Sequence, residues 1–199
     1  MCQVRLVVPV ALVPLLAMLV ASTAAAQEAP ASKHELEVIG GLGISIPREK
    51  EGRDGDGRGG FVAAEYVFLP RHVFSLRLYA GAVVTLPNDS SCRSPPCDTE
   101  AQIGFTGAKV RVMAPIPWVG PYLELGLGAS VGYMRTYYTR PYYGTTDETL
   151  RGATFHIPFA LGLALGRQHE FDVAFSYLFH PAQSQVVGAV AVGLKFAVP

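Results

Sequence analysis

The sequence predicts an all-β fold, an eight-stranded antiparallel up-and-down transmembrane β-barrel. Three observations lead to this prediction. Segments in which apolar residues alternate with polar or small ones recur eight times, one side-chain parity is apolar in each segment, and the connections are alternately long and short. Successive side chains of a strand point to opposite faces, so every segment would have one apolar face. An even number of such strands, with short turns at one end and long loops at the other, is typical of barrels that cross a membrane.

The first four strands are predicted from this alternation. They are residues 35–46, 62–68, 74–86 and 101–113. In the first strand Leu36 and Val38 alternate with Glu35 and Glu37, and the third is equally regular. The fourth has a weaker pattern, in which apolar residues oppose Lys109 and Arg111.

The remaining four strands include the clearest segment of the chain. They are residues 121–133, 154–165, 171–179 and 186–196. Within 121–133, the apolar parity holds Leu123, Leu125, Leu127, Ala129, Val131 and Tyr133, and the other parity holds Glu124, Gly126, Gly128, Ser130 and Gly132. Phenylalanine, leucine and valine dominate one parity of the last three strands.

The order of the connections separates the two ends of the predicted barrel. The connections after the first, third and fifth strands are long and polar, and they are residues 47–60, 87–100 and 135–151. The connections after the second, fourth and sixth strands have three to seven residues. All long loops therefore lie at one end. Closing the sheet would pair every backbone group in lipid, which an open sheet could not do.

Charged residues on the less apolar parity predict which face is inside. This parity carries four acids and four bases, which are Glu37, Glu65, Glu124, Asp172, Arg77, Lys109, Arg111 and Lys195. Equal and opposite charges suit an enclosed space, where unpaired charges are costly. We therefore expect an interior charge network and an apolar exterior, with Glu65 directly opposite Arg77 and Arg111 opposite Glu124. The alternative is a soluble sheet whose charges are solvated.

Residues 35–198, with these strands and this order of connections, resemble the small eight-stranded outer-membrane barrels of Gram-negative bacteria, the group that includes the barrel domain of outer-membrane protein A. The resemblance is architectural. It implies an integral position in the outer membrane, contact with outer-membrane lipid, and insertion by the barrel-assembly machinery. Such proteins usually end on an aromatic residue, whereas here Phe196 is followed by three more residues.

The N-terminus predicts export. Arg5, the apolar stretch 6–20 and the small residues up to Ala26 form the three regions of a secretory signal peptide, residues 1–26, with a short periplasmic lead at 27–34. An anchoring helix is the alternative. The apolar stretch has fifteen residues and contains prolines, which falls short of the ~20 residues that span a bilayer.

Two cysteines remain after cleavage, Cys92 and Cys97. In an exported protein such a pair predicts a disulfide that constrains a loop. Metal binding is the alternative, but two thiolates without a nearby histidine make a poor zinc site. We expect neither a metal nor a cofactor. The 16 basic and 16 acidic residues balance, which gives no indication of a nucleic-acid partner.

The interior of eight strands is just wide enough for side chains to fill it, so we expect no open general pore. The charges should form a plug near the short turns. Beyond it we expect a wetter half that is lined by small residues, which are Gly81, Gly126, Gly128, Ser130, Gly132 and Gly162.

Function is therefore expected in the loops or in the structural presence of the barrel. The loop 135–151 contains candidate contact residues, which are Tyr137, Tyr138, Arg140, Tyr142 and Tyr143. Tyrosine and arginine are favoured at protein contacts, which suggests binding of a surface partner. The alternative is that these tyrosines belong to the membrane-interface girdle and the strands continue beyond the membrane.

Two further functions are alternatives, a narrow small-solute channel and a lipid-modifying enzyme. An enzyme of this kind would need a histidine within hydrogen-bond reach of a serine and a carboxylate. His180 lies near Ser184, and His156 is predicted to project inward. Asp172 lies at the far end of its strand, so neither histidine has a third partner, and no catalytic residue is predicted.

Overall fold

The structure, a computed structural model, describes residues 34–47, 56–68, 73–87, 98–140, 144–182 and 185–198. For residues 47, 98, 136–140, 144–148, 150 and 185 it describes the backbone alone. The predicted signal peptide, the predicted disulfide of Cys92 and Cys97, and the contact candidates Tyr142 and Tyr143 lie outside the described residues.

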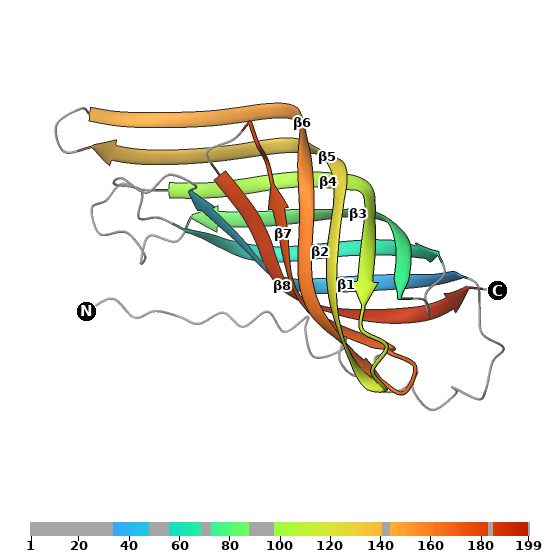
Figure 1. The fold of residues 1–199 in the computed structure, drawn as a ribbon. Coiled ribbons are helices and arrows are strands. Elements are labelled where there is room, and N and C mark those ends of the chain that lie inside the picture. The colour runs from blue at the N-terminus through green and yellow to red at the C-terminus, as the bar shows by residue number, and fades with distance from the viewer. Residues whose placement is uncertain are drawn as a thin grey trace, which may run out of the picture. The chain divides into compact units, whose positions relative to one another are not determined.

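The described chain consists of eight strands. They are β1 (His34–Pro47), β2 (Gly57–Phe68), β3 (Phe74–Pro87), β4 (Asp98–Met113), β5 (Trp118–Arg140), β6 (Gly144–Gly166), β7 (Phe171–Phe179) and β8 (Gln185–Val198). Each strand pairs antiparallel with the next, and β1 pairs with β8, so the sheet closes into a barrel (Figure 1). This confirms the predicted fold class.

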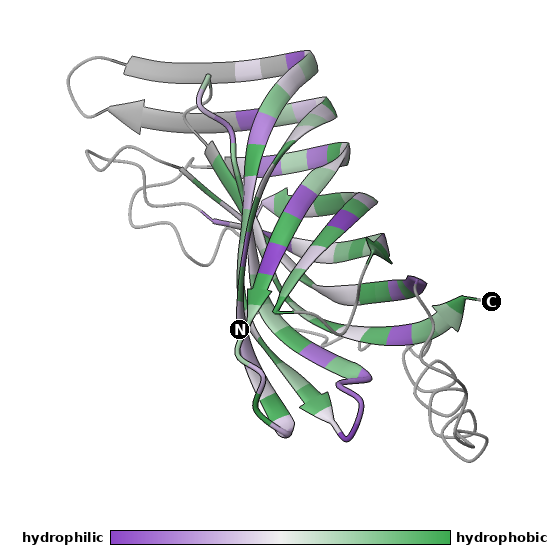
Figure 2. Ribbon diagram, turned by 45° about the vertical axis from the view of Figure 1, so that its right-hand side comes forward, coloured by the Kyte–Doolittle hydropathy of each residue, from purple (hydrophilic) through white to green (hydrophobic). Residues whose placement is uncertain are grey.

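Apolar side chains cover the outside of this barrel. Leu42 is 72%, Leu127 67% and Val131 61% exposed. Hydrophobic and hydrophilic residues alternate along the strands in Figure 2, and Glu37, Glu65 and Glu124 are among the charged residues that are buried. A continuous apolar exterior of this size would be unstable in water, so it indicates a lipid surround. None of the described residues form a helix long and apolar enough to cross a membrane.

The strands β5 and β6 are longer than predicted. Each has 23 residues, and they pair up to Arg140 and Gly144. Most of the connection that we predicted as a loop, 135–151, is therefore a β-hairpin, so the strands continue beyond their predicted ends. The stretch is rich in threonine and tyrosine, which favour extended backbone over a loop.

The half of the interior nearest the long loops is packed with apolar side chains. This cluster is formed by Phe61, Ala63, Tyr79, Val83, Ala101, Ile103, Phe105, Met134, Leu178, Val187, Ala189 and Ala191. The expectation of a wetter half was wrong, because the small residues that line it make room for large ones on facing strands. A Cβ atom on Gly81 would lie 2.6 Å from the Phe105 ring, and one on Gly128 would lie 2.2 Å from the Tyr79 hydroxyl.

This packing predicts that Gly128→Ala destabilises the barrel. The added methyl group would collide with Tyr79, the His156 ring and the Thr106 carbonyl, and overpacking of a filled interior costs about 1 to 3 kcal/mol. The loss would be measured by urea unfolding in lipid vesicles, followed by the fluorescence of Trp118, which is the single tryptophan of the chain. Gly40→Ala is the control, because a Cβ there meets no atom within 4 Å. Equal stability of the two variants would contradict the packing described here.

Candidate functional site: the polar interior

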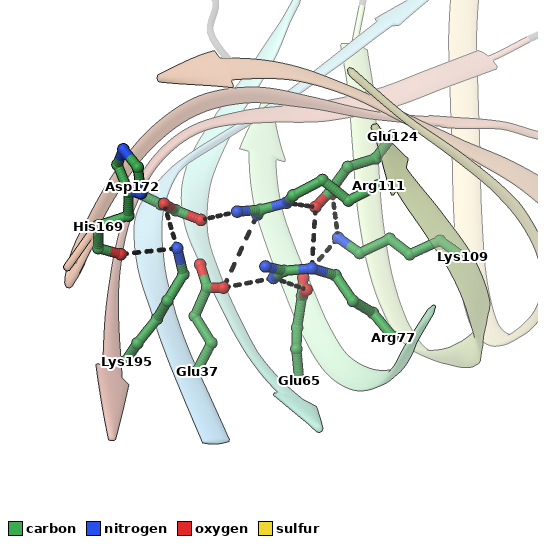
Figure 3. Close-up of polar contacts among 9 residues, drawn as sticks. All are labelled: Glu37, Glu65, Arg77, Lys109, Arg111, Glu124, His169, Asp172 and Lys195. Atoms are coloured by element: carbon green, nitrogen blue, oxygen red, sulfur yellow. Dashed lines mark hydrogen bonds and ion pairs between the residues drawn. The ribbon is translucent and has the colours of Figure 1, made fainter. Parts of the chain in front are cut away.

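All eight charged residues predicted for the interior lie inside the barrel (Figure 3). Their positions are Glu37 on β1, Glu65 on β2, Arg77 on β3, Lys109 and Arg111 on β4, Glu124 on β5, Asp172 on β7 and Lys195 on β8. Seven are buried and Lys195 is half-buried. Seven of the eight strands therefore contribute to one cluster, which we call the ionic network.

Glu124 contacts three cations of the ionic network. Its carboxylate lies 2.5 Å from Lys109 Nζ and 2.5 Å from Arg111 Nε. Arg77 Nε lies 3.5 Å away. Because one carboxylate cannot neutralise three cations, the other acids complete the balance.

Glu65 and Glu37 face the same cations from the first two strands. Glu65 accepts hydrogen bonds from Arg77 at 3.0 Å and from Lys109 at 2.5 Å, and Glu37 accepts one from Arg77. Arg77 therefore lies between three carboxylates that come from three different strands.

Asp172 joins this group to the barrel end with the short turns. Its carboxylate lies 2.5 Å from Arg111 Nη1 and 2.8 Å from Lys195 Nζ. Lys195 also donates to the His169 carbonyl oxygen of the β6–β7 turn at 2.8 Å. The Arg111 guanidinium stacks on the Tyr122 ring, 3.5 Å from its centroid, an arrangement that favours a desolvated cation.

The strand register differs between the two pairs that we predicted. Arg111 lies directly opposite Glu124, as expected. Glu65 lies opposite Tyr79, and Arg77 lies opposite Val67. The β2–β3 register is centred one residue later than predicted, which moves the partner by two positions. The long arginine side chain nevertheless reaches Glu65 diagonally.

The energetics of the ionic network depend on its completeness. Removal of one partner of a buried ion pair leaves an uncompensated charge, which costs about 3 to 5 kcal/mol. With four acids and four bases joined by ion pairs, the ionic network has equal numbers of positive and negative groups.

A second polar cluster lies above the ionic network, inside the apolar packing. Its hydrogen bonds join Tyr79 to His156 Nε2 at 2.6 Å, His156 Nδ1 to Ser130 Oγ at 2.9 Å, and Ser130 Oγ to His180 Nε2 at 3.0 Å. All four side chains are buried. The prediction for His156 as an inward residue agrees with this position, but Tyr79 and Ser130 were missed as its partners. Only the inward parity of each residue could be read from the sequence.

This cluster lacks the features of a catalytic or metal site. Among the described residues, no carboxylate hydrogen-bonds to His156 or His180, and no group of three metal-ligating residues occurs. Ser130 is 1% exposed. Ser184, the serine we considered beside His180, lies outside the described residues.

The surface-contact candidates Tyr137, Tyr138 and Arg140 lie in the outer part of β5. The backbone there pairs with β6, and β4 pairs alongside as far as Asp98 opposite Tyr137. The hairpin is thus supported by a third strand along part of its length.

No protein-family model and no curated relative matches the sequence. Solved structures with a similar fold include Ail, the attachment invasion locus protein of Yersinia pestis, which is 15% identical with a TM-score of 0.48 and matches 82% of this chain and 99% of that one. Neisserial surface protein A is 12% identical with a TM-score of 0.49 over 85% of this chain and 100% of that one. The N-terminal barrel domain of Pseudomonas aeruginosa OprF is 11% identical with a TM-score of 0.42 over 83% and 99%.

The contacts of Glu124 predict that Glu124→Gln destabilises the barrel strongly. Three cations would then face one acid fewer, at a cost of about 3 to 5 kcal/mol. Urea unfolding in lipid vesicles measures the change. The double variant Glu124→Gln/Lys109→Met restores electrical neutrality, and we expect it to be more stable than the single variant. A double variant at least as unstable as the sum of its two single variants would show that neutrality is not what stabilises this interior.

Proposed function

We propose that this eight-stranded outer-membrane barrel is a sealed scaffold that holds surface segments in place and does not pass solutes. The apolar exterior lies in the lipid of the bacterial outer membrane, and the strand ends that the long connections join lie at one end of the barrel. The proposal is supported by the side chains that fill the interior in the described part of the chain.

Two layers fill the interior. The ionic network closes the half nearest the short turns, and the apolar cluster with the Tyr79–Ser130 hydrogen bonds closes the other half. The cavity between them, bounded by Lys109, Phe61 and Ala191, has a volume of about 20 Å³, which suits roughly one water molecule. A larger cavity of about 410 Å³ lies beside the short turns, between Met113, Ile116 and Lys195. It ends at the ionic network.

A sealed interior predicts that the reconstituted protein adds no sugar permeability to liposomes. Swelling in a sugar solution would match that of empty liposomes, whereas a general porin reconstituted at the same density serves as the positive control. Planar-bilayer recordings test the same point for ions. Steady conductance comparable to that of the porin would overturn the sealed-scaffold proposal and favour the channel alternative.

A role in surface contact is the second candidate, and the β5–β6 hairpin favours it. The last pair between β6 and β7 is Ile157 with Phe179, so β6 continues for the thirteen residues 144–156 beyond its neighbour. At roughly 3.3 Å per residue this is about 40 Å of strand. Figure 1 shows the hairpin projecting beyond the other strands. A paired hairpin presents the residues of β5 in a fixed order, which lowers the entropy cost of binding.

If the hairpin carries a contact function, deletion of residues 137–146 should reduce attachment of cells that display the protein. The barrel itself should persist, because the deleted residues lie outside the ionic network and the apolar cluster. The cells would be compared at equal amounts of folded protein, measured from the intensity of the unboiled, folded band on a gel. Shortening the β1–β2 connection is the matched control. Unchanged attachment after the hairpin deletion would leave only the scaffold role.

The enzyme alternative has less support. The hydrogen bonds of His156 and His180 to Ser130 are buried, and they lie on the inner face, away from the lipid that a lipid-modifying enzyme would need to reach. We therefore do not propose catalysis.

A further inference from the structure

The pairing between β6 and β7 ends at the base of the β5–β6 hairpin. Its last pair is Ile157 with Phe179, and among the described residues no strand pairs with β6 on this side beyond that point. Continued by one residue, the same register would place His156 opposite His180. Both side chains are 0% exposed. Two buried histidines therefore occupy the position at which the backbone pairing of β6 with β7 stops.

His180 faces the lumen because the alternation of β7 continues through it. Asp172 and Leu178, which are buried inward residues of β7, share its parity. Pro181 follows, and a proline restricts the preceding residue to extended backbone. The side chain of His180 is therefore directed inward, although β7 itself ends at Phe179.

Side-chain contacts join the two histidines where the backbone pairing ends. The Ser130 hydroxyl of β5 lies 2.9 Å from His156 Nδ1 and 3.0 Å from His180 Nε2. The centroids of the two imidazole rings are 5.6 Å apart. We call Ser130, His156 and His180 the histidine clasp. It joins both strands of the hairpin, at their base, to the start of the β7–β8 connection.

The charges around the histidine clasp do not include an acidic partner. Among the described residues, no carboxylate hydrogen-bonds to either histidine. The titratable groups that face it are Tyr79 on β3, 2.6 Å from His156 Nε2, and Lys109 on β4, whose Nζ lies 5.6 Å from the Tyr79 ring centroid. The inward charges of the other strands pair within the ionic network, and they are Glu37, Glu65, Glu124, Asp172 and Lys195.

Proton uptake would change what the histidine clasp can bond. A neutral imidazole has one N–H donor and one acceptor nitrogen, whereas the protonated ring has two donors and a positive charge. With both rings protonated, two buried charges would lie 5.6 Å apart with no carboxylate to offset them. Water can solvate these charges once the contacts open. The open form therefore binds more protons than the closed form, so the closed form loses stability as the pH falls.

We propose that the histidine clasp is a pH-sensitive fastening of the β5–β6 hairpin. At neutral pH the uncharged rings hold the unpaired side of β6 to the start of the β7–β8 connection. Protonation of both rings releases β6 beyond Ile157. An imidazole in water takes up its proton near about pH 6.5, so release occurs below that value. The inference concerns how the hairpin is held, and it stands whether or not the hairpin binds a partner.

The test uses the full isotope-labelled barrel in lipid nanodiscs at about pH 7.5 and about pH 5, on either side of the ordinary histidine value. Imidazole nitrogen chemical shifts would report the protonation of His156 and His180. Backbone relaxation would report motion of residues 149–156, with relaxation dispersion for the slower range. We expect the order parameters of these amides to fall from about 0.85 to about 0.6 at the lower pH, and to recover when the pH is raised.

Replacement of both histidines by glutamine separates proton uptake from other effects of acid. Glutamine keeps an amide donor and acceptor but takes up no proton, so His156→Gln/His180→Gln should show the same hairpin motion at both pH values. His169→Gln is the matched control, because His169 lies in the β6–β7 turn at the other end of the barrel, and it should keep the response. Folding of each variant is verified by heat-modifiable gel migration.

Three outcomes would overturn the proposal. The first is equal hairpin motion at both pH values in protein whose imidazoles are protonated at the lower one. The second is imidazoles that stay neutral at about pH 5. The third is a pH response that persists in the double glutamine variant. The first two are measured in the unaltered protein, so they decide the matter even when a variant does not fold.

Discussion

Closure of β1 onto β8 is the constraint on which the rest of this structure depends. In lipid no water can hydrogen-bond to a free strand edge, so the backbone of the spanning sheet must be paired throughout. Once the ring closes, alternating side chains have only two destinations, lipid or a narrow lumen. Every strand must therefore supply apolar residues to one face and residues that can be satisfied in a small space to the other. The four acids and four bases follow from this requirement.

The lumen satisfies the requirement in two different ways along its length. Near the short turns it uses charges that neutralise one another, with Glu124 and Arg77 in contact across strands that are distant in sequence. Near the long loops it uses aromatic rings, and the glycines of facing strands give these rings their space. The side chains of Tyr79, His156, Ser130 and His180 fit within the apolar half because they hydrogen-bond to one another.

Much of this architecture could be predicted because alternate residues of a strand lie on opposite faces of the sheet. The eight strands, the inward charges and the pairing of Arg111 with Glu124 followed from that periodicity and from a short turn. The position of Glu65 opposite Tyr79 could not be predicted. A turn centred one residue later changes the partner of every residue in β2 and β3. The packing over Gly128 was also missed, because periodicity reveals which face a residue occupies and not what stands across the lumen. The length of the β5–β6 hairpin could not be predicted, because its polar residues are also typical of a loop.

The Ser130 hydroxyl has one proton and two imidazole neighbours, so it can donate to only one of them. If it donates to His180, then His156 must carry its proton on Nδ1, and the Tyr79 phenol must donate to the other ring nitrogen. In the opposite arrangement Ser130 donates to His156 Nδ1, His156 donates from Nε2 to the Tyr79 oxygen, and His180 donates from Nε2 to Ser130, while the phenol proton points away from His156. The tautomers of the two buried rings are therefore not independent: the four side chains share a single polarity that reverses as a unit.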